Sequence, residues 1–118
     1  MIKLIAFLKR NPALSRDEFH AHWRDVHGPL IRDTPELARH IVRYEQHPRL
    51  ASDYERPHSQ EWDGVAVQWF ESMDDLVAMV SEPAYAERLR PDEQVLLDMD
   101  ALEVLFVEAP RVLIGDEA

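Results

Sequence analysis

Apolar residues are concentrated in four stretches of the chain, and segments with helical periodicity lie between them. The four stretches are rich in β-branched and aromatic residues and are bounded by turn-forming residues, which is typical of strands. We expect strands at residues 2–9, 39–47, 64–70 and 101–109.

The segment after the first strand has the pattern of an amphipathic helix. Ser15 and Glu18 have the spacing of a capping box, so the helix should begin at about Arg16. Gly28-Pro29 should end it, because a left-handed glycine cap would be followed by a residue that cannot continue a helix.

A second helical part follows the third strand. Ser72 and Asp75 form another capping pair, and we expect Pro83 and Pro91 each to start a further helical turn. Residues 48–62 are polar and contain two prolines, so we expect a surface loop there. Residues 110–118 should form a short tail, and the length of 118 residues suits a single domain over 1–118.

The element order β-α-β-β-α-β predicts an α+β, ferredoxin-like fold: a four-stranded antiparallel sheet with both helices on one face. The strands, however, are apolar on both sides. The first has Leu4, Ala6 and Leu8 on one side and Ile5 and Phe7 on the other. Since the helices can cover only one face, we expect a second copy to cover the other, giving a homodimer of facing sheets.

Composition excludes several classes of function. The formal net charge is −10, with 23 acidic and 13 basic residues, which disfavours nucleic-acid binding. There are no cysteines, and the three glycines cannot build a phosphate loop or a nucleophile elbow. No stretch is long enough to span a membrane, so we expect a cytoplasmic protein without a membrane partner.

Three histidines lie in the first helix, in the stretch "FHAHWRDVHGPL". At about 100° per residue, the buried stripe should consist of Phe19, Trp23 and Val26. His20 and His27 should share one shoulder of this stripe, with His22 on the other. This geometry disfavours chelation from one helix, so we expect no metal site.

Two interpretations of His27 remain open. It could cap the last carbonyls of the helix, or it could act as a general acid or base at the edge of the apolar layer.

The stretch "LSRDEFHAHWRDVHGPLI" resembles the EthD family pattern "LS.EEF..YWR..H.PL", and "DGVAVQWFESMDDL" is similar to the family's "DG.AE.WF.S...L". The first match rests on Leu14, Ser15, Glu18, Phe19, Trp23, Arg24, His27, Pro29 and Leu30. The resemblance implies a dimeric α/β barrel made of ferredoxin-like halves. Relatives of the family include cofactor-free lactone isomerases and polyketide dehydratases, in which histidines in a cavity between sheet and helices move protons.

On this resemblance the candidate catalytic residues are His27, His22 and His47, the last near the end of the second strand. Trp23, Tyr44, Trp69 and Phe70 are candidate substrate contacts, with core packing as the alternative. We expect a cofactor-independent lyase or isomerase that acts on a hydrophobic, carbonyl-bearing small molecule, such as a lactone, an aromatic compound or a polyketide intermediate. The alternatives are a non-catalytic small-molecule-binding or accessory protein of an oxygenase system, and a cofactor-free monooxygenase.

Overall fold

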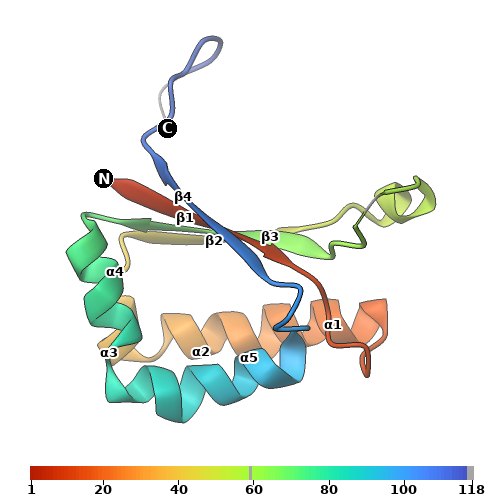
Figure 1. The fold of residues 1–118 in the computed structure, drawn as a ribbon, viewed down its shortest axis with the longest axis horizontal. Helices are drawn as coiled ribbons and strands as arrows, with labels where there is room; N and C mark the ends of the chain where they lie inside the picture. Colours follow the sequence, from red (N-terminus) through yellow and green to blue (C-terminus); the bar gives the residue numbers. More distant parts are fainter. Residues whose placement is uncertain (59, 117–118) are drawn as a thin grey trace.

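Four antiparallel strands form one sheet in this computed structural model, which describes residues 1–58 and 60–116. The strand order is β2-β3-β1-β4, with bounds β1 (Ile2–Leu8), β2 (Arg43–Pro48), β3 (Gly64–Phe70) and β4 (Glu103–Glu108). The long helices all lie on one side of the sheet (Figure 1). This confirms the ferredoxin-like α+β fold.

The first helical part differs from the prediction in its length. It runs without a break through α1 (Arg16–His22), η1 (Trp23–His27) and α2 (Gly28–Arg32). The capping box of Ser15 and Glu18 is present at its start. The expected stop at Gly28 is wrong, because Gly28 has helical angles (φ −59°, ψ −53°).

Packing explains why glycine and proline are found inside this helix. A Cβ atom at Gly28 would lie 2.7 Å from the side-chain nitrogen of Gln46 on β2, so glycine allows the helix to approach the sheet. Pro29 follows the η1 turn, which already interrupts the regular ladder of backbone hydrogen bonds. Its missing N–H therefore costs little there.

The second helical part shows the same behaviour. After α4 (Met73–Val80), the chain passes from η3 (Tyr85–Leu89) directly into α5 (Arg90–Leu96). The helical turn predicted to start at Pro91 is present as α5, which begins one residue earlier, but it continues η3 without a break. Both long helices thus contain one π-helical turn followed within two residues by a proline.

Between the two helical parts, the second strand is shorter than predicted. The short helix α3 (Pro35–Ala38) precedes β2, which begins at Arg43 rather than at residue 39. The predicted loop begins one residue later than expected, because Pro48 still pairs with Gly64 as the last residue of β2. The loop includes the short 3₁₀-helix η2 (Ala51–Glu55). Ser59 in this loop and residues 117–118 of the predicted tail lie outside the described residues.

The two faces of the sheet follow the alternation of the strands. Leu4, Ala6 and Leu8 lie on the helix side, where they line the space beneath the helices. Ile5 lies on the other side and is the direct neighbour of Val67 on β3 and of Leu105 on β4. We call this other side the open face, because Figure 1 shows no helix over it.

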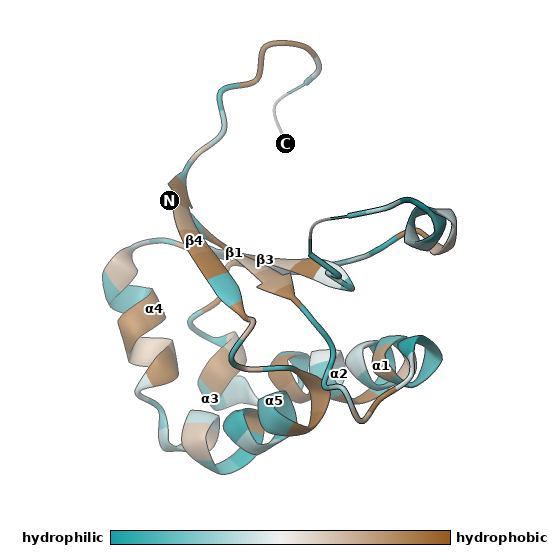
Figure 2. Cartoon of the chain, turned by 45° about the vertical axis from the view of Figure 1, so that its right-hand side comes forward, coloured by the Kyte–Doolittle hydropathy of each residue, from teal (hydrophilic) through white to brown (hydrophobic). Residues whose placement is uncertain are grey.

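Exposed apolar residues also occur beyond the sheet. The C-terminal segment carries Val112, Leu113 and Ile114, all exposed, and extends above the open face (Figures 1 and 2). In Figure 2, β4 is likewise coloured as mostly apolar. Within the described residues, every helix is too short or too polar to cross a lipid bilayer.

The centre of the helix-side core is the indole ring of Trp23, which packs with Phe19, Ala6 and Ala66. A Cβ atom at Gly64 would lie 2.6 Å from the Trp23 ring and 3.0 Å from the backbone oxygen of His47. These neighbours are a buried ring and a strand backbone, neither of which has room to move.

Gly64→Ala is therefore expected to lower the free energy of unfolding by about 1–3 kcal/mol, the usual effect of overpacking. Gly28→Ala is the matched control. Its new methyl group would meet the amide of Gln46, the end of a flexible side chain, and would disturb the two hydrogen bonds of that amide. The gain in helix propensity of about 1 kcal/mol offsets part of that loss, so the effect should be smaller than that of Gly64→Ala. Urea unfolding of both variants measures the difference, and equal stability of the two would contradict this account.

Candidate active site

The η1 turn decides which side chains of the first helix are buried. Its backbone bond runs from the N–H of Gly28 to the carbonyl of Trp23, five residues earlier, instead of the usual four. The expected placement of Val26 in the buried stripe is wrong, since Val26 is 46% exposed. His27 is 7% exposed and occupies the buried side instead.

The same turn brings two of the predicted histidines together. His22 and His27 are five residues apart, so a π-helical turn places them on one side of the helix. The expectation that His22 points away from His27 is therefore wrong. Both rings bind one carboxylate, that of Asp92 on α5: His22 Nε2 lies 2.7 Å from Oδ1, and His27 Nδ1 lies 2.7 Å from Oδ2.

This contact fixes the tautomer of His27. A carboxylate oxygen only accepts hydrogen bonds, so Nδ1 of His27 carries the hydrogen that is donated to Asp92. Burial lowers the pKa of His27, and the hydrogen bond and charge of Asp92 offset this only in part. The ring is thus neutral near pH 7, with a lone pair on Nε2, which bonds to none of the described residues.

His27 lines a cavity of about 130 Å³ between the helices and the sheet. Most of its wall is apolar. Its polar or hydrogen-bonding side chains are Trp23, His27, Tyr44, Gln68, Tyr85 and Glu93. The predicted residues His27, Trp23 and Tyr44 thus line one cavity. His22 does not line it, but it binds Asp92, which also binds His27.

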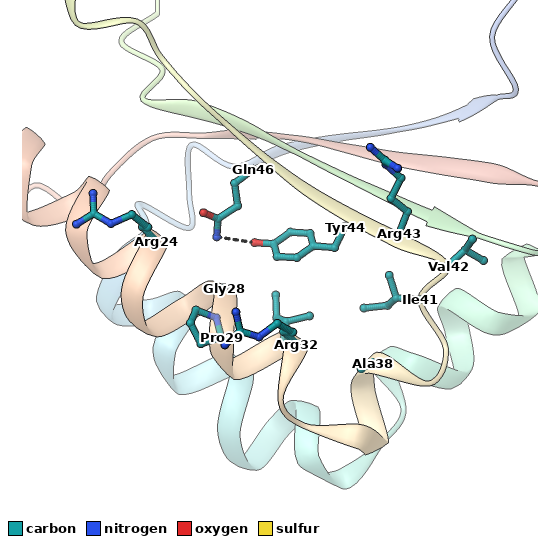
Figure 3. Close-up of a pocket in the computed structure, with 11 residues that line it drawn as sticks. Arg24, Gly28, Pro29, Arg32, Ala38, Ile41, Val42, Arg43, Tyr44 and Gln46 are labelled. Atoms are coloured by element: carbon teal, nitrogen blue, oxygen red, sulfur yellow. Dashed lines mark hydrogen bonds between the residues drawn. The ribbon is translucent and has the colours of Figure 1, made fainter. Parts of the chain in front are cut away.

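Tyr44 lines this cavity from β2, and its hydroxyl group is held by Gln46 on the same strand. The side-chain amide of Gln46 donates to the Tyr44 oxygen (3.0 Å) and to the backbone oxygen of Trp23 (2.9 Å), as Figure 3 shows for Tyr44. Burial raises the pKa of Tyr44, so the hydroxyl keeps its proton. Its oxygen accepts from Gln46, and its hydrogen has no acceptor among the described residues.

A hydrogen-bonded pair, Tyr85 and Glu93, forms another part of the cavity wall. Tyr85 on η3 donates its hydroxyl hydrogen to Glu93 on α5, at 3.1 Å. Burial raises the pKa of both groups. The cavity is therefore bordered by a base, His27, and by hydroxyl and carboxyl groups that tend to hold their protons.

An outer pocket of about 390 Å³ lies beside the β2 edge of the sheet (Figure 3). Ile31, Ile41 and Tyr44 line both this pocket and the cavity, so they form the wall between the two. A rearrangement of these three side chains would connect the cavity to solvent on this side.

Three other predicted site residues are not brought to the cavity. His47 points to the open face, where it binds Glu45 at 2.8 Å, because strand alternation separates it from Tyr44. Trp69 also lies on the open face, beneath the amino group of Lys3. Phe70 is on the helix side but is fully buried in a core cluster and does not line the cavity.

Sequence reasoning missed Asp92, Glu93, Gln46 and Gln68. Asp92 and Glu93 follow Pro91 and resemble the ordinary acidic first turn of a helix, so nothing marks them as site residues. The glutamines carried a usable signal, because each occupies a helix-side position where the neighbouring strand residues are apolar.

Comparison with known proteins identifies the family of this chain. The model of the EthD domain family matches residues 11–100. The chain belongs to the EthD family. No curated protein sequence matches it.

Solved structures similar to this EthD protein include an EthD family protein from Bacillus halodurans C-125, with a TM-score of 0.66, 17% identity and coverage of 92% of this chain and 97% of that one. HapK from Hahella chejuensis has a TM-score of 0.67 at 17% identity, covering 100% and 99%. A dimeric protein of unknown function with a ferredoxin-like fold from Bacteroides fragilis has a TM-score of 0.64 at 13% identity, covering 91% and 94%. These identities are low, so the similarity shows the shared fold.

The fold of this EthD protein also explains the stretch on which the family resemblance was based. Trp23 begins the π-helical turn, His27 ends it, and Pro29 lies in the turn of α-helix that follows. The stretch "WRDVHGP" thus encodes the local backbone that turns His27 toward the cavity.

Proposed function

We propose that this EthD protein is a cofactor-independent isomerase or lyase that transfers protons on a small, apolar, carbonyl-bearing molecule. The observation that carries the proposal is the pair of His27 and Asp92 beside the cavity. A neutral imidazole whose other nitrogen is held by a carboxylate is the usual arrangement of a general base.

The proposed reaction begins at a C–H bond next to the substrate carbonyl. Nε2 of His27 removes the proton, and the electron pair of the C–H bond moves onto the carbonyl oxygen to form an enolate. Tyr44 donates a hydrogen bond to that oxygen, while Asp92 stabilises the imidazolium. The imidazolium then returns the proton to another carbon, which gives an isomer, or to a β-hydroxyl group, which leaves as water.

Hydrogen exchange tests this proposal without knowledge of the natural substrate. The probe is α-angelica lactone, a small unsaturated lactone with an acidic C–H bond, incubated with the protein in D₂O. Proton NMR should show catalysed deuterium uptake beside the carbonyl and migration of the double bond. Rates no higher than those with heat-denatured protein, for this lactone and for a panel of small ketones, would contradict proton transfer.

A binding protein without catalysis is the second candidate function, and one observation favours it. Two buried polar atoms of the cavity wall, on Trp23 and Gln68, have no partner among the described residues, which suits a ligand whether or not it reacts. Tight ligand binding together with no exchange would support this second candidate.

We also propose that the chain forms a homodimer through its open face. The row Val67, Ile5 and Leu105 makes that face apolar at its centre, and the exposed C-terminal segment lies on the same side. The similar protein from Bacteroides fragilis is itself described as dimeric.

Leu105→Lys is expected to convert the dimer to a monomer, because it places a charge at the β4 end of the apolar row, on the face that would be buried. Leu105 is already 54% exposed in the single chain, so the fold should tolerate the change. Leu50→Lys, in the polar loop, is the control. Light scattering should give twice 13.8 kDa for the wild type and for the control, and 13.8 kDa for Leu105→Lys. A wild-type mass of 13.8 kDa would refute the dimer.

A further inference from the structure

Two polar atoms in the cavity wall are buried and lack any hydrogen-bond partner among the described residues. They are the indole nitrogen Nε1 of Trp23, a donor, and the amide oxygen Oε1 of Gln68, an acceptor. Trp23 is 2% exposed, and its Nε1 lies close enough to the Tyr44 hydroxyl to lower the pKa of that group, although the two do not form a hydrogen bond. Buried polar groups in native proteins are nearly always paired, so an unpaired donor and acceptor in one cavity indicate a missing partner.

The position of Gln68 supports a role in binding. On β3 it lies directly between Tyr44 of β2 and Leu4 of β1, in the middle of the sheet. Its neighbours on the same side of the strand are Ala66 and Phe70, both buried and apolar. An apolar residue would satisfy the core at this position, so the amide is of use only to something in the cavity.

The charges of the cavity wall limit what that partner is. Among the residues that the structure describes, no lysine or arginine lines the cavity. The titratable side chains that line it are His27, Tyr44, Tyr85 and Glu93, with Asp92 and His22 behind His27. A ligand with a carboxylate or phosphate would be buried in this mostly apolar wall without a cation, which is strongly unfavourable. The ligand is therefore neutral.

The volume sets the size of the ligand. The cavity of about 130 Å³ is close to the roughly 150 Å³ of an apolar protein cavity that binds benzene. A single unsaturated ring with small substituents fills such a space.

We propose that the cavity binds a neutral, single-ring compound that carries one hydroxyl or N–H group and one carbonyl oxygen. The hydroxyl or N–H group donates a hydrogen bond to Gln68 Oε1, and Trp23 Nε1 donates a hydrogen bond to the carbonyl oxygen. This inference rests on the proposed function in using the same cavity, and it narrows the substrate class to small phenols, enols or lactams that also bear a carbonyl. Free aromatic acids are excluded.

Four ring compounds of nearly equal size test the proposal by titration calorimetry at slightly acidic pH, where the phenols are neutral. They are meta-hydroxybenzaldehyde with both groups, meta-tolualdehyde with the carbonyl alone, meta-cresol with the hydroxyl alone, and meta-hydroxybenzoate with an anion. Meta-hydroxybenzaldehyde should bind about tenfold more tightly than meta-tolualdehyde, which leaves Gln68 Oε1 unpaired, and than meta-cresol, which leaves Trp23 Nε1 unpaired. The benzoate should bind most weakly.

Gln68→Met keeps the size of the side chain and removes the amide. In this variant the advantage of meta-hydroxybenzaldehyde over meta-tolualdehyde should disappear, while Gln94→Met, at an exposed position of α5, should retain it. The wild-type ranking is informative even if Gln68→Met does not fold. Equal binding of the four compounds, no binding of any of them, or an advantage that survives Gln68→Met would each overturn the proposal.

These outcomes are separable from the test of proton transfer. Binding in the predicted order without deuterium exchange on any compound would leave the ligand class standing and refute the proposed enzyme. Exchange on α-angelica lactone without this order of binding would refute the ligand class alone.

Discussion

His27→Ala is expected to reduce the catalysed deuterium exchange of α-angelica lactone by about 10²–10⁴-fold, the usual contribution of a general base. The reason is geometric: His27 is the cavity residue whose free nitrogen has a lone pair at neutral pH, and Asp92 holds the opposite nitrogen. Proton NMR in D₂O gives the rate directly.

Two further variants separate chemistry from folding. His58→Ala removes a histidine from the exposed loop and should leave the rate unchanged. His22→Ala should lower the rate less than His27→Ala does, because Asp92 still accepts the hydrogen bond of His27. Wild-type exchange by a folded His27→Ala variant would remove the base from the mechanism.

The pH dependence of the rate gives an independent readout of the same residue. Burial lowers the pKa of His27, and only its neutral form removes a proton. The rate should therefore stay constant as pH falls to the range where an exposed histidine titrates, and decline only at lower pH. A decline already at or above the normal pKa of histidine would contradict a buried base.

Asp63→Ala is expected to lower the free energy of unfolding by about 3 kcal/mol, the low end for breaking a buried ion pair. Asp63 is 0% exposed. Its carboxylate accepts three hydrogen bonds: from the side chain of Arg10 (2.7 Å), from the backbone N–H of Arg10 (2.9 Å) and from the hydroxyl of Tyr54 (2.6 Å). Alanine would leave these donors without a partner, and the partial exposure of Arg10 keeps the effect from being larger.

Asp63→Ala should also destabilise the loop of residues 48–62. Tyr54 lies on η2, and its hydroxyl oxygen accepts from His20 on α1 at 2.9 Å, so Asp63 helps to connect the loop with the first helix. Urea unfolding gives the stability, and limited proteolysis should show earlier cleavage in the loop. Asp33→Ala, which breaks an exposed pair with Arg32, is the control and should change stability by less than about 1 kcal/mol. Similar values for the two variants would refute the structural role of Asp63.

Most of the fold could be predicted from the sequence, because strands and caps depend on local signals. The strand Gly64–Phe70 was predicted with its correct bounds, and the capping pairs at Ser15 and Ser72 are present. The prediction failed at Gly28-Pro29. That dipeptide normally ends a helix, but here the glycine has a packing role, because a Cβ atom at position 28 would lie 2.7 Å from Gln46 of a distant strand.

The site could be predicted only in part. His27, Trp23 and Tyr44 were selected from the family resemblance, and they do line one cavity. Angles of 100° per residue could not place His22 beside His27, since they assume an uninterrupted α-helix. Asp92, which joins the two, is 70 residues from His22 along the chain, and no local pattern reveals such a pairing.

The π-helical turns at Trp23–His27 and Tyr85–Leu89 have a consequence for how this protein tolerates change in length. Each turn amounts to one surplus residue in a helix. Removing that residue would restore a uniform spiral and rotate every side chain on one flank of the turn relative to the other. Substitutions around the cavity alter its lining one position at a time, whereas a single-codon deletion within either turn would separate Trp23 from His27, or Tyr85 from Glu93, in one step.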